Sequence, residues 1–119
     1  MAKDPKAILQ ELNDGAGSLA QLQPDRMKAC GGVSAAAFKG GDALDAKTKE
    51  LIAASIGLAI RCDYCIVHHV HGALKAGATR EELIEAAFTT IGMGGGPAVT
   101  YAATLYLDSV EAFAPDFGK

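Results

Sequence analysis

The feature that most constrains the fold is a group of two cysteines and a histidine within residues 61–71, a segment with helical rather than strand-like patterning. Cys62 and Cys65 are separated by two residues, and His69 is the fourth residue after Cys65. Because an α-helix turns by about 100° per residue, all three side chains would fall within roughly 60° of one another. The segment is therefore predicted to be a helix that presents two thiols and an imidazole on one partly buried face.

The other two histidines of this segment do not share that face. On the same helical wheel His71 points to nearly the opposite side, and His68 lies well away from the cysteines. His69 alone is therefore placed to serve both thiols.

The rest of the chain is predicted to be helical too, because no segment alternates convincingly between apolar and polar residues. Breaks and capping residues divide it into about six helices. These are a short helix ending at 13–15, a second from Pro24 to 40–41, a third capped by Asp45, the cysteine helix closed by Gly77, a fifth opened by the capping box Thr79–Glu82, and a last one from Pro97.

Apolar spacing predicts which parts of these helices are buried. Residues 51–60 carry no charge, so we expect a central helix buried on all sides. It should form either a tight hairpin or a kinked pair with the cysteine helix that follows. Cys30 is interpreted as a small core residue of the second helix. The inner face of the last helix is assigned to Val99, Ala103, Tyr106, Val110 and Phe113.

Length and composition indicate one domain, residues 1–119, that assembles with copies of itself. Half of the 119 residues are apolar, but many of them are alanine and there is no tryptophan. Alanine buries little area, so the core of a single protomer would be thin and a homo-oligomer is expected.

Charge and hydropathy exclude several classes of function. The net charge is −3 and the basic residues are scattered, which argues against a nucleic-acid surface or an anionic-membrane patch. Residues 86–107 are uncharged, but glycines and Pro97 divide them, so we do not expect a membrane span. The polar start shows no secretory signal, so the cytoplasm is the expected compartment.

The Cys62–Cys65 pair is compatible with several chemistries. A structural disulfide is disfavoured in the cytoplasm, c-type haem attachment would need a histidine where Ile66 stands, and a thioredoxin-like fold would need strands. A small zinc-binding or redox-sensor module stays open, with both cysteines, His69 and His68 as candidate ligands, although no second Cys/His cluster completes the site. A redox dithiol that needs no metal is preferred.

Such a dithiol has a defined chemistry. A helix N-terminus and a nearby imidazole favour the thiolate, and His69 can accept the thiol proton. The thiolate could attack a peroxide and become a sulfenic acid, which the other cysteine captures as a disulfide. Glu50, near the start of the central helix, falls within roughly one helical turn of His69 in a hairpin, so it could orient the imidazole from its own chain or from a neighbouring subunit.

Glu50, Cys62, Cys65 and His69, at this spacing, resemble the active-site pattern of the alkylhydroperoxidase AhpD-like proteins of the carboxymuconolactone decarboxylase superfamily. The residues around them, including 49–52, 64–66, 77–79 and 81–84, look like the same domain over roughly residues 33–107. The resemblance implies an all-helical fold, a trimer or hexamer, and thiol peroxidase or disulfide reductase activity.

By this resemblance Cys65 is the attacking thiol, Cys62 the resolving thiol, and His69 with Glu50 the proton relay. The substrate would be a hydroperoxide, and the electrons would come from an external dithiol such as dihydrolipoamide rather than from a bound cofactor. Some members carry a histidine where this chain has Tyr64. The decarboxylase branch works without the cysteine pair, so a lactone enzyme is the alternative rather than the preferred activity.

Overall fold

The computed structural model describes residues 2–119, and every regular element within them is helical. In chain order the elements are α1 (Pro5–Leu22), α2 (Pro24–Phe38), α3 (Ala46–Ala59), α4 (Asp63–Lys75), α5 (Arg80–Gly94), α6 (Gly96–Tyr101), the π-helical turn η1 (Ala102–Tyr106), α7 (Leu107–Phe113) and the 3₁₀ turn η2 (Ala114–Phe117). Because α6, η1 and α7 follow one another without a break, they form a single rod. The prediction of an all-α fold with about six helices is confirmed for this part of the chain.

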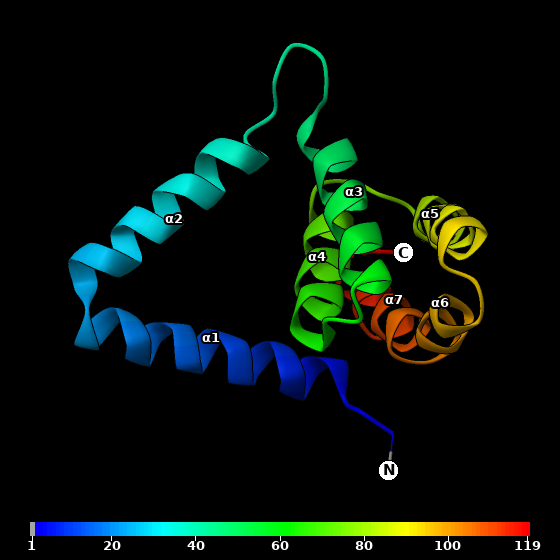
Figure 1. Ribbon diagram of the computed structural model, residues 1–119, viewed down its shortest axis with the longest axis horizontal. Helices are drawn as coiled ribbons and strands as arrows, with labels where there is room; N and C mark the ends of the chain where they lie inside the picture. The colour runs from blue at the N-terminus through cyan, green and yellow to red at the C-terminus, as the bar shows by residue number, and fades with distance from the viewer. Residues whose placement is uncertain (1) are drawn as a thin grey trace.

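The helices form a packed body and a projecting arm (Figure 1). α3 and α4 lie side by side, and α5, α6 and α7 cover them on one side. α1 and α2 form the arm, which extends from the other side. The two helices are two edges of an open triangle whose third edge is the α3–α4 pair. The apolar core lies in the body and includes Leu58, Ile66, Val67, Val70, Leu74, Leu83, Tyr106, Val110 and Phe113.

Local capping fixes the helix boundaries of the body as predicted. The side chain of Asp45 accepts the Thr48 N–H at 2.8 Å and begins α3. Thr79 and Glu82 form a complete capping box at the start of α5. Gly77, just after α4, has a φ of 106°, a conformation that suits glycine because it has no Cβ.

The first helix is longer than predicted. It was expected to stop at 13–15, but α1 continues through Gly15 and Gly17 to Leu22. Each glycine disfavours a helix by about 1 kcal/mol relative to alanine. α1 nevertheless continues, because half-buried residues at four-residue spacing line the side of the helix that faces its neighbours α2, α4 and α7. These residues are Ile8, Leu12, Ala16 and Ala20.

The prediction that Cys30 is a core residue is wrong. Cys30 is exposed, and α2 contains no buried residue at all. The helical spacing was identified correctly, but α2 belongs to the arm and meets the body only near its C-terminal end, so most of its apolar side is left exposed.

The central helix α3 is buried on one side only, contrary to the prediction. Ala54 and Leu58 are fully buried, whereas Ile52 and Ile56 are 43% and 53% exposed. The exposed side borders an apolar groove of about 560 Å³ between α3 and α5. The absence of charge from a helix is therefore not sufficient evidence that the helix is buried on all sides.

The inner face of the last helix changes at the π-helical turn η1. Tyr106, Val110 and Phe113 are buried as predicted, but Val99 and Ala103 are exposed. A π turn holds one extra residue, which rotates the preceding part of the helix relative to a regular 3.6-residue period. A constant period therefore assigns the wrong face before the turn.

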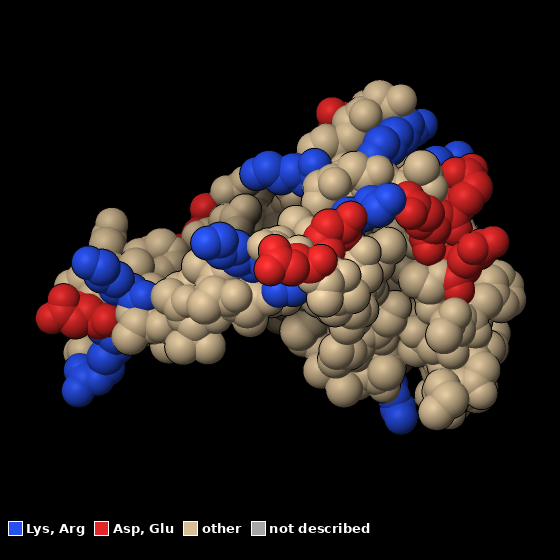
Figure 2. Space-filling view, turned by 90° about the horizontal axis from the view of Figure 1, so that it is seen from above, with Lys and Arg blue, Asp and Glu red and all other residues tan. Residues whose placement is uncertain are grey.

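The face drawn in Figure 2 carries charges of both signs. Its basic side chains are spread over the arm and the body, whereas several acidic side chains gather at the edge of the body farthest from the arm. Within residues 2–119, no helix combines the length and the hydropathy that crossing a bilayer requires.

Candidate active site

The turn between α3 and α4 brings the cysteines to the end of the hairpin. Arg61 adopts a left-handed conformation with a φ of 57°, which reverses the chain within a few residues. The Cys62 N–H then donates to the Gly57 carbonyl at 3.0 Å, tying the start of α4 to the last turn of α3. Of the two arrangements predicted for these helices, the structure has the tight hairpin rather than the kinked pair.

Gly57 allows the two helices of the hairpin to approach closely at Cys65. A Cβ at position 57 would lie 3.0 Å from the Cys65 Cβ and 3.2 Å from the Cys65 carbonyl carbon. Any larger residue would push α4 away from α3. The absence of a side chain at Gly57 therefore sets the position of Cys65.

Cys62 and Cys65 are joined by a disulfide, with their Cα atoms 5.2 Å apart. Cys62 is the N-cap of α4 rather than part of the helix, a difference from the continuous helix predicted for residues 61–71. Its Sγ accepts the Cys65 N–H at 3.2 Å. Both sulfurs thus lie at a helix N-terminus, where the helix dipole favours negative charge and would stabilise a thiolate after reduction.

His69 and Glu50 are in direct contact within one chain. The imidazole Nδ1 lies 2.8 Å from Glu50 Oε2, and both side chains are about four-fifths buried, with exposures of 18% and 20%. The sequence suggested this contact without distinguishing one chain from two. The α3–α4 hairpin is sufficient to make it.

The carboxylate of Glu50 occupies the space beside Gly72. A Cβ at position 72 would lie 2.6 Å from Glu50 Oε2, so a side chain there would collide with the carboxylate. An ionised carboxylate accepts a hydrogen bond from Nδ1–H, which leaves Nε2 of His69 as a proton acceptor. Glu50 therefore fixes both the orientation of the ring and the nitrogen that is available for chemistry.

The remaining histidines of α4 surround this pair without joining it. His68 makes an edge-to-face contact with His69, with the ring centroids 4.7 Å apart, and burial lowers its pKa. His71 packs against Phe113 and Phe117, and burial lowers its pKa as well. Both shifts favour neutral rings at pH 7.

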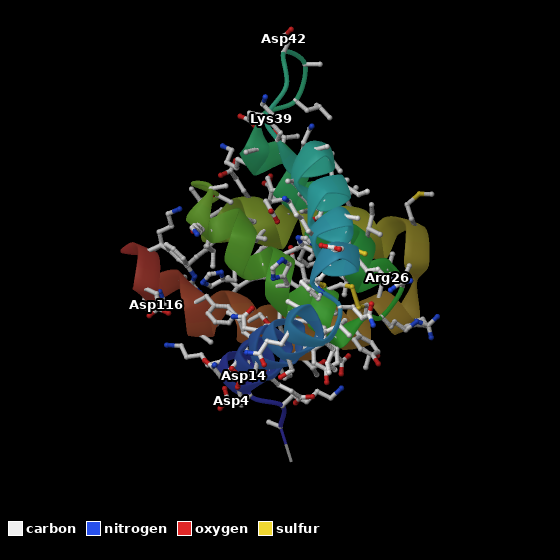
Figure 3. The ribbon with its side chains drawn as sticks, turned by 90° about the vertical axis from the view of Figure 1, so that its left-hand side faces the viewer. Asp4, Asp14, Arg26, Lys39, Asp42 and Asp116 are labelled. Carbon is white, nitrogen blue, oxygen red and sulfur yellow. A yellow bond between two sulfur atoms is a disulfide. The ribbon has the colours of Figure 1, made fainter. Side chains whose placement is uncertain are left out.

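Tyr64, between the two cysteines, is directed to the arm rather than to His69. Its hydroxyl donates to Glu11 Oε1 at 2.5 Å, and this hydrogen bond raises the Tyr64 pKa. Next to it, Asp63 forms an ion pair with Lys3. Two consecutive residues of the cysteine segment thus connect it to the N-terminal part of the chain. Figure 3 views the molecule from the side of the arm and shows the disulfide as a yellow bond.

One residue of the site was missed by sequence reasoning. Phe38, at the end of α2, stacks on His69 with parallel rings. The sequence places it 31 residues before His69 on a different helix, and no spacing rule connects positions so far apart. Only the path of the arm brings the two rings together.

The zinc alternative finds little support in this geometry. Among residues 2–119, no group of three or more His, Cys, Asp or Glu side chains is arranged to hold a metal ion. The two cysteines are bonded to each other, so zinc ligation would apply only to the reduced protein.

The sequence and the fold both match known proteins. The chain is 43% identical to an uncharacterized protein of Cupriavidus necator, covering 94% of this chain and 100% of that protein. Its fold is similar to that of a carboxymuconolactone decarboxylase family protein from Legionella pneumophila, with a TM-score of 0.87 and 36% identity over 92% and 96% of the two chains.

A second solved structure extends the likeness in fold. A carboxymuconolactone decarboxylase family protein from Thermotoga maritima has a TM-score of 0.71 at 24% identity, covering 92% of this chain and 89% of that one. The sequence model of the Carboxymuconolactone decarboxylase family matches residues 24–108, which include the arm helix α2, the hairpin and most of the last rod. From this match, and from the similarity to the Legionella protein, we conclude that the chain belongs to the carboxymuconolactone decarboxylase family.

Proposed function

We propose that this protein is a thiol-dependent peroxidase and disulfide oxidoreductase that cycles Cys62 and Cys65 between dithiol and disulfide. The observation that carries the proposal is the disulfide at the start of α4, on the same hairpin as the hydrogen-bonded His69–Glu50 pair. A redox cycle of this kind needs two sulfurs that can bond to each other and a base that accepts and returns a proton. The two helices of the hairpin supply both.

In the oxidising half of the cycle, the Cys65 thiolate attacks the terminal oxygen of a hydroperoxide. The O–O bond breaks, the alcohol leaves with the proton that the thiol gave up, and Cys65 becomes a sulfenic acid. The Cys62 thiol then attacks that sulfur, water leaves, and the disulfide forms. The choice of Cys65 as the attacking thiol follows the family resemblance.

In the reducing half, an external dithiol of the dihydrolipoamide type restores both thiols and is itself oxidised to a disulfide. Thiol exchange is faster when the leaving sulfur has the lower pKa. The Cys65 N–H that donates to Cys62 Sγ supports Cys62 as the leaving thiolate, and hence attack of the donor on Cys65. The cycle uses sulfur chemistry alone, without a metal or a bound cofactor.

His69 and Glu50 are proposed to move the proton in both halves. With Nδ1 held by the carboxylate, Nε2 can accept the thiol proton directly or through water and return it to the leaving alkoxide. Glu50 then stabilises the imidazolium that forms, because the positive ring and the carboxylate are in contact.

Thiol titration tests the proposal. In a Cys30→Ser background, which removes the third, exposed thiol, one equivalent of cumene hydroperoxide should consume both remaining thiols, and a dithiol should restore them. Cys65→Ser should abolish peroxide turnover with a dithiol donor. Turnover that survives this substitution would refute the proposal.

Family membership supports a second candidate, a lactone decarboxylase. A double variant, Cys62→Ala with Cys65→Ala, separates the two activities, since only a lactone enzyme would keep its activity. The zinc-binding or sensor alternative predicts stoichiometric zinc in protein purified without chelator, released when the cysteines are alkylated. Zinc-free protein with a reversible dithiol favours the peroxidase.

We also propose that the protein works as a homo-oligomer, a trimer or hexamer by the family resemblance, in the cytoplasm, where donor dithiols are kept reduced. Its accessible surface is 7210 Å², whereas a compact monomer of 12.2 kDa would expose about 6,100 Å². The excess is comparable to the roughly 800 Å² that each partner buries in a standard interface. Sedimentation at micromolar concentration should show the assembly, and a monomer there would contradict it.

A further inference from the structure

We infer that Phe38 is a positioning residue for His69, pressed against the imidazole by a clamp from Lys49. The inference rests on the proposed function, because it concerns the proton acceptor of that reaction. Phe38 ends α2, a helix without a single buried residue. Nevertheless its ring lies parallel to that of His69, with the centroids 4.9 Å apart and the planes inclined by 10°.

Lys49, which is on α3, forms the clamp by binding the C-terminal end of α2. Its ammonium donates to the carbonyl of Ala37 at 3.0 Å and to that of Lys39 at 2.6 Å. The last carbonyls of a helix lack partners within the helix, and they carry the negative end of its dipole, so a lysine is well suited to this position. Figure 3 labels Lys39 at this end of the arm.

The same turn of α3 thus holds both the arm and the relay. Lys49 fastens the end of α2, and its neighbour Glu50 fastens Nδ1 of His69. If the clamp opens, the phenyl ring of Phe38 loses its support, because Met27 is the only other residue of α2 that is even half-buried.

Three contacts then determine the orientation of the imidazole. Glu50 holds Nδ1, Phe38 covers one face, and the ring of His68 makes a T-shaped contact with it. These contacts leave Nε2 free, while rotation of the ring would collide with Phe38 and break the bond to the carboxylate. A displacement of about 1 Å at a reacting group can lower a rate by as much as a hundredfold, so a residue that prevents this rotation contributes to the rate without touching the substrate.

The stacking is tested by NMR of the His69 ring. A phenyl ring above the imidazole shifts the Hδ2 and Hε1 resonances upfield, and Phe38→Leu should remove this shift while Phe38→Tyr retains it. Lys49→Met should weaken it through loss of the clamp. Val33→Ala, an exposed position on the same helix, should leave both resonances unchanged. Identical His69 resonances in Phe38→Leu and the parent protein would overturn the inference.

The effect on chemistry is tested with a thiol reaction that needs no peroxide. In a Cys30→Ser, Cys62→Ser background, the rate of Cys65 alkylation by iodoacetamide reports how well the thiolate is generated. Phe38→Leu and Lys49→Met should each slow this reaction about tenfold, with Phe38→Tyr restoring it. Recovery of the rate with tyrosine but not with leucine would indicate that an aromatic ring is needed, rather than any apolar side chain that fills the space. Equal alkylation rates in all variants would exclude a positioning role.

The two proposals can fail separately. If alkylation depends on Phe38 but the parent protein does not reduce hydroperoxides, the proposed function is wrong and the positioning role is retained. If hydroperoxide is reduced equally well by Phe38→Leu and by the parent, the positioning role is wrong and the proposed function is retained.

Discussion

The α3–α4 hairpin and the α1–α2 arm are both pairs of consecutive helices, but they are held in different ways. α4 buries five of its residues, and its first turn is tied to α3 by a backbone hydrogen bond. α2 buries none, and its far end is fastened to the body through Lys49 and Phe38. The difference shows that the candidate chemistry is located in the part of the molecule that is fixed by its own packing.

The glycines of the two regions express the same contrast. In the hairpin, Gly57 and Gly72 are places where a Cβ would collide with Cys65 or with the Glu50 carboxylate. In the arm, a Cβ at Gly31 would meet nothing within 4 Å. Glycine is needed for close contact in the hairpin, whereas in the arm of the single chain it has no contact that requires it.

The largest effect is expected for Gly57→Ala, which would break the contact that defines the hairpin. The new Cβ would meet the backbone of Cys65 and Ile66, which cannot move aside as a flexible side chain could. Overpacking of this kind costs about 2 kcal/mol in the free energy of unfolding. Urea denaturation would measure it, and an unchanged midpoint would show that the helices are less closely packed than described.

Gly72→Ala should affect the rate rather than the stability. The atoms that the new Cβ would meet belong to the end of the Glu50 side chain, so the carboxylate should move and lose its bond to His69. We expect peroxide turnover to fall about tenfold with the helical circular dichroism unchanged. Gly92→Ala, in an open part of α5, is the matched control and should retain full turnover.

In the arm, Gly31→Ala should raise the free energy of unfolding, whereas Gly57→Ala in the hairpin should lower it. Replacing an open glycine within a helix by alanine stabilises by about 0.5–1 kcal/mol, because alanine loses less backbone entropy on folding. Thermal unfolding at fixed protein concentration would show a higher midpoint. A lower midpoint would mean that another copy of the chain packs closely on this side of α2, as the proposed oligomer would allow.

The smallest effect is expected in the pH dependence of stability. It arises because α3 of the hairpin begins with a titratable cap and α2 of the arm does not. Hydrogen bonds from the side chain and the backbone of Thr48 hold the pKa of Asp45, the cap of α3, below its ordinary value of 3.8. Because the folded-state pKa is the lower one, the stabilisation is present above 3.8 and is lost as the pH falls through the folded value. α2 begins at Gln23 without a side-chain cap and has no such dependence.

Asp45→Asn provides the check, because asparagine also caps helices but does not titrate in this range. Between pH 5 and pH 2, the parent should lose slightly more stability than the variant in urea titrations. Parallel curves would indicate that the cap contributes nothing measurable to α3.

Sequence reasoning succeeded where the relevant interactions are local. The capping box Thr79–Glu82 and the cap Asp45 each involve residues three positions apart, so their pattern is visible without a structure. The spacing of Cys62 and Cys65 likewise allowed a disulfide within one turn, and the hairpin followed from two adjacent apolar segments. These are short-range properties of the backbone and its side-chain donors and acceptors.

It failed where the same local pattern is compatible with more than one environment. Cys30 and Ile56 have helical spacing in a buried or an exposed helix alike, and only the direction of the arm and the open side of α3 decided their exposure. The π turn before Leu107 altered the inner face of the last helix, which a constant period could not reveal.

The amino-acid pattern alone was enough to predict the helical composition, the helix boundaries set by caps, and the four polar residues of the candidate site at their fixed spacing. The tertiary structure decided that Glu50 reaches His69 within one chain and that Phe38, from a distant helix, lies on the same imidazole. The difference lies in how far apart along the chain the interacting residues are. Hydrogen bonds and turns between near neighbours are encoded in a few residues, whereas contacts between helices depend on how the whole chain packs.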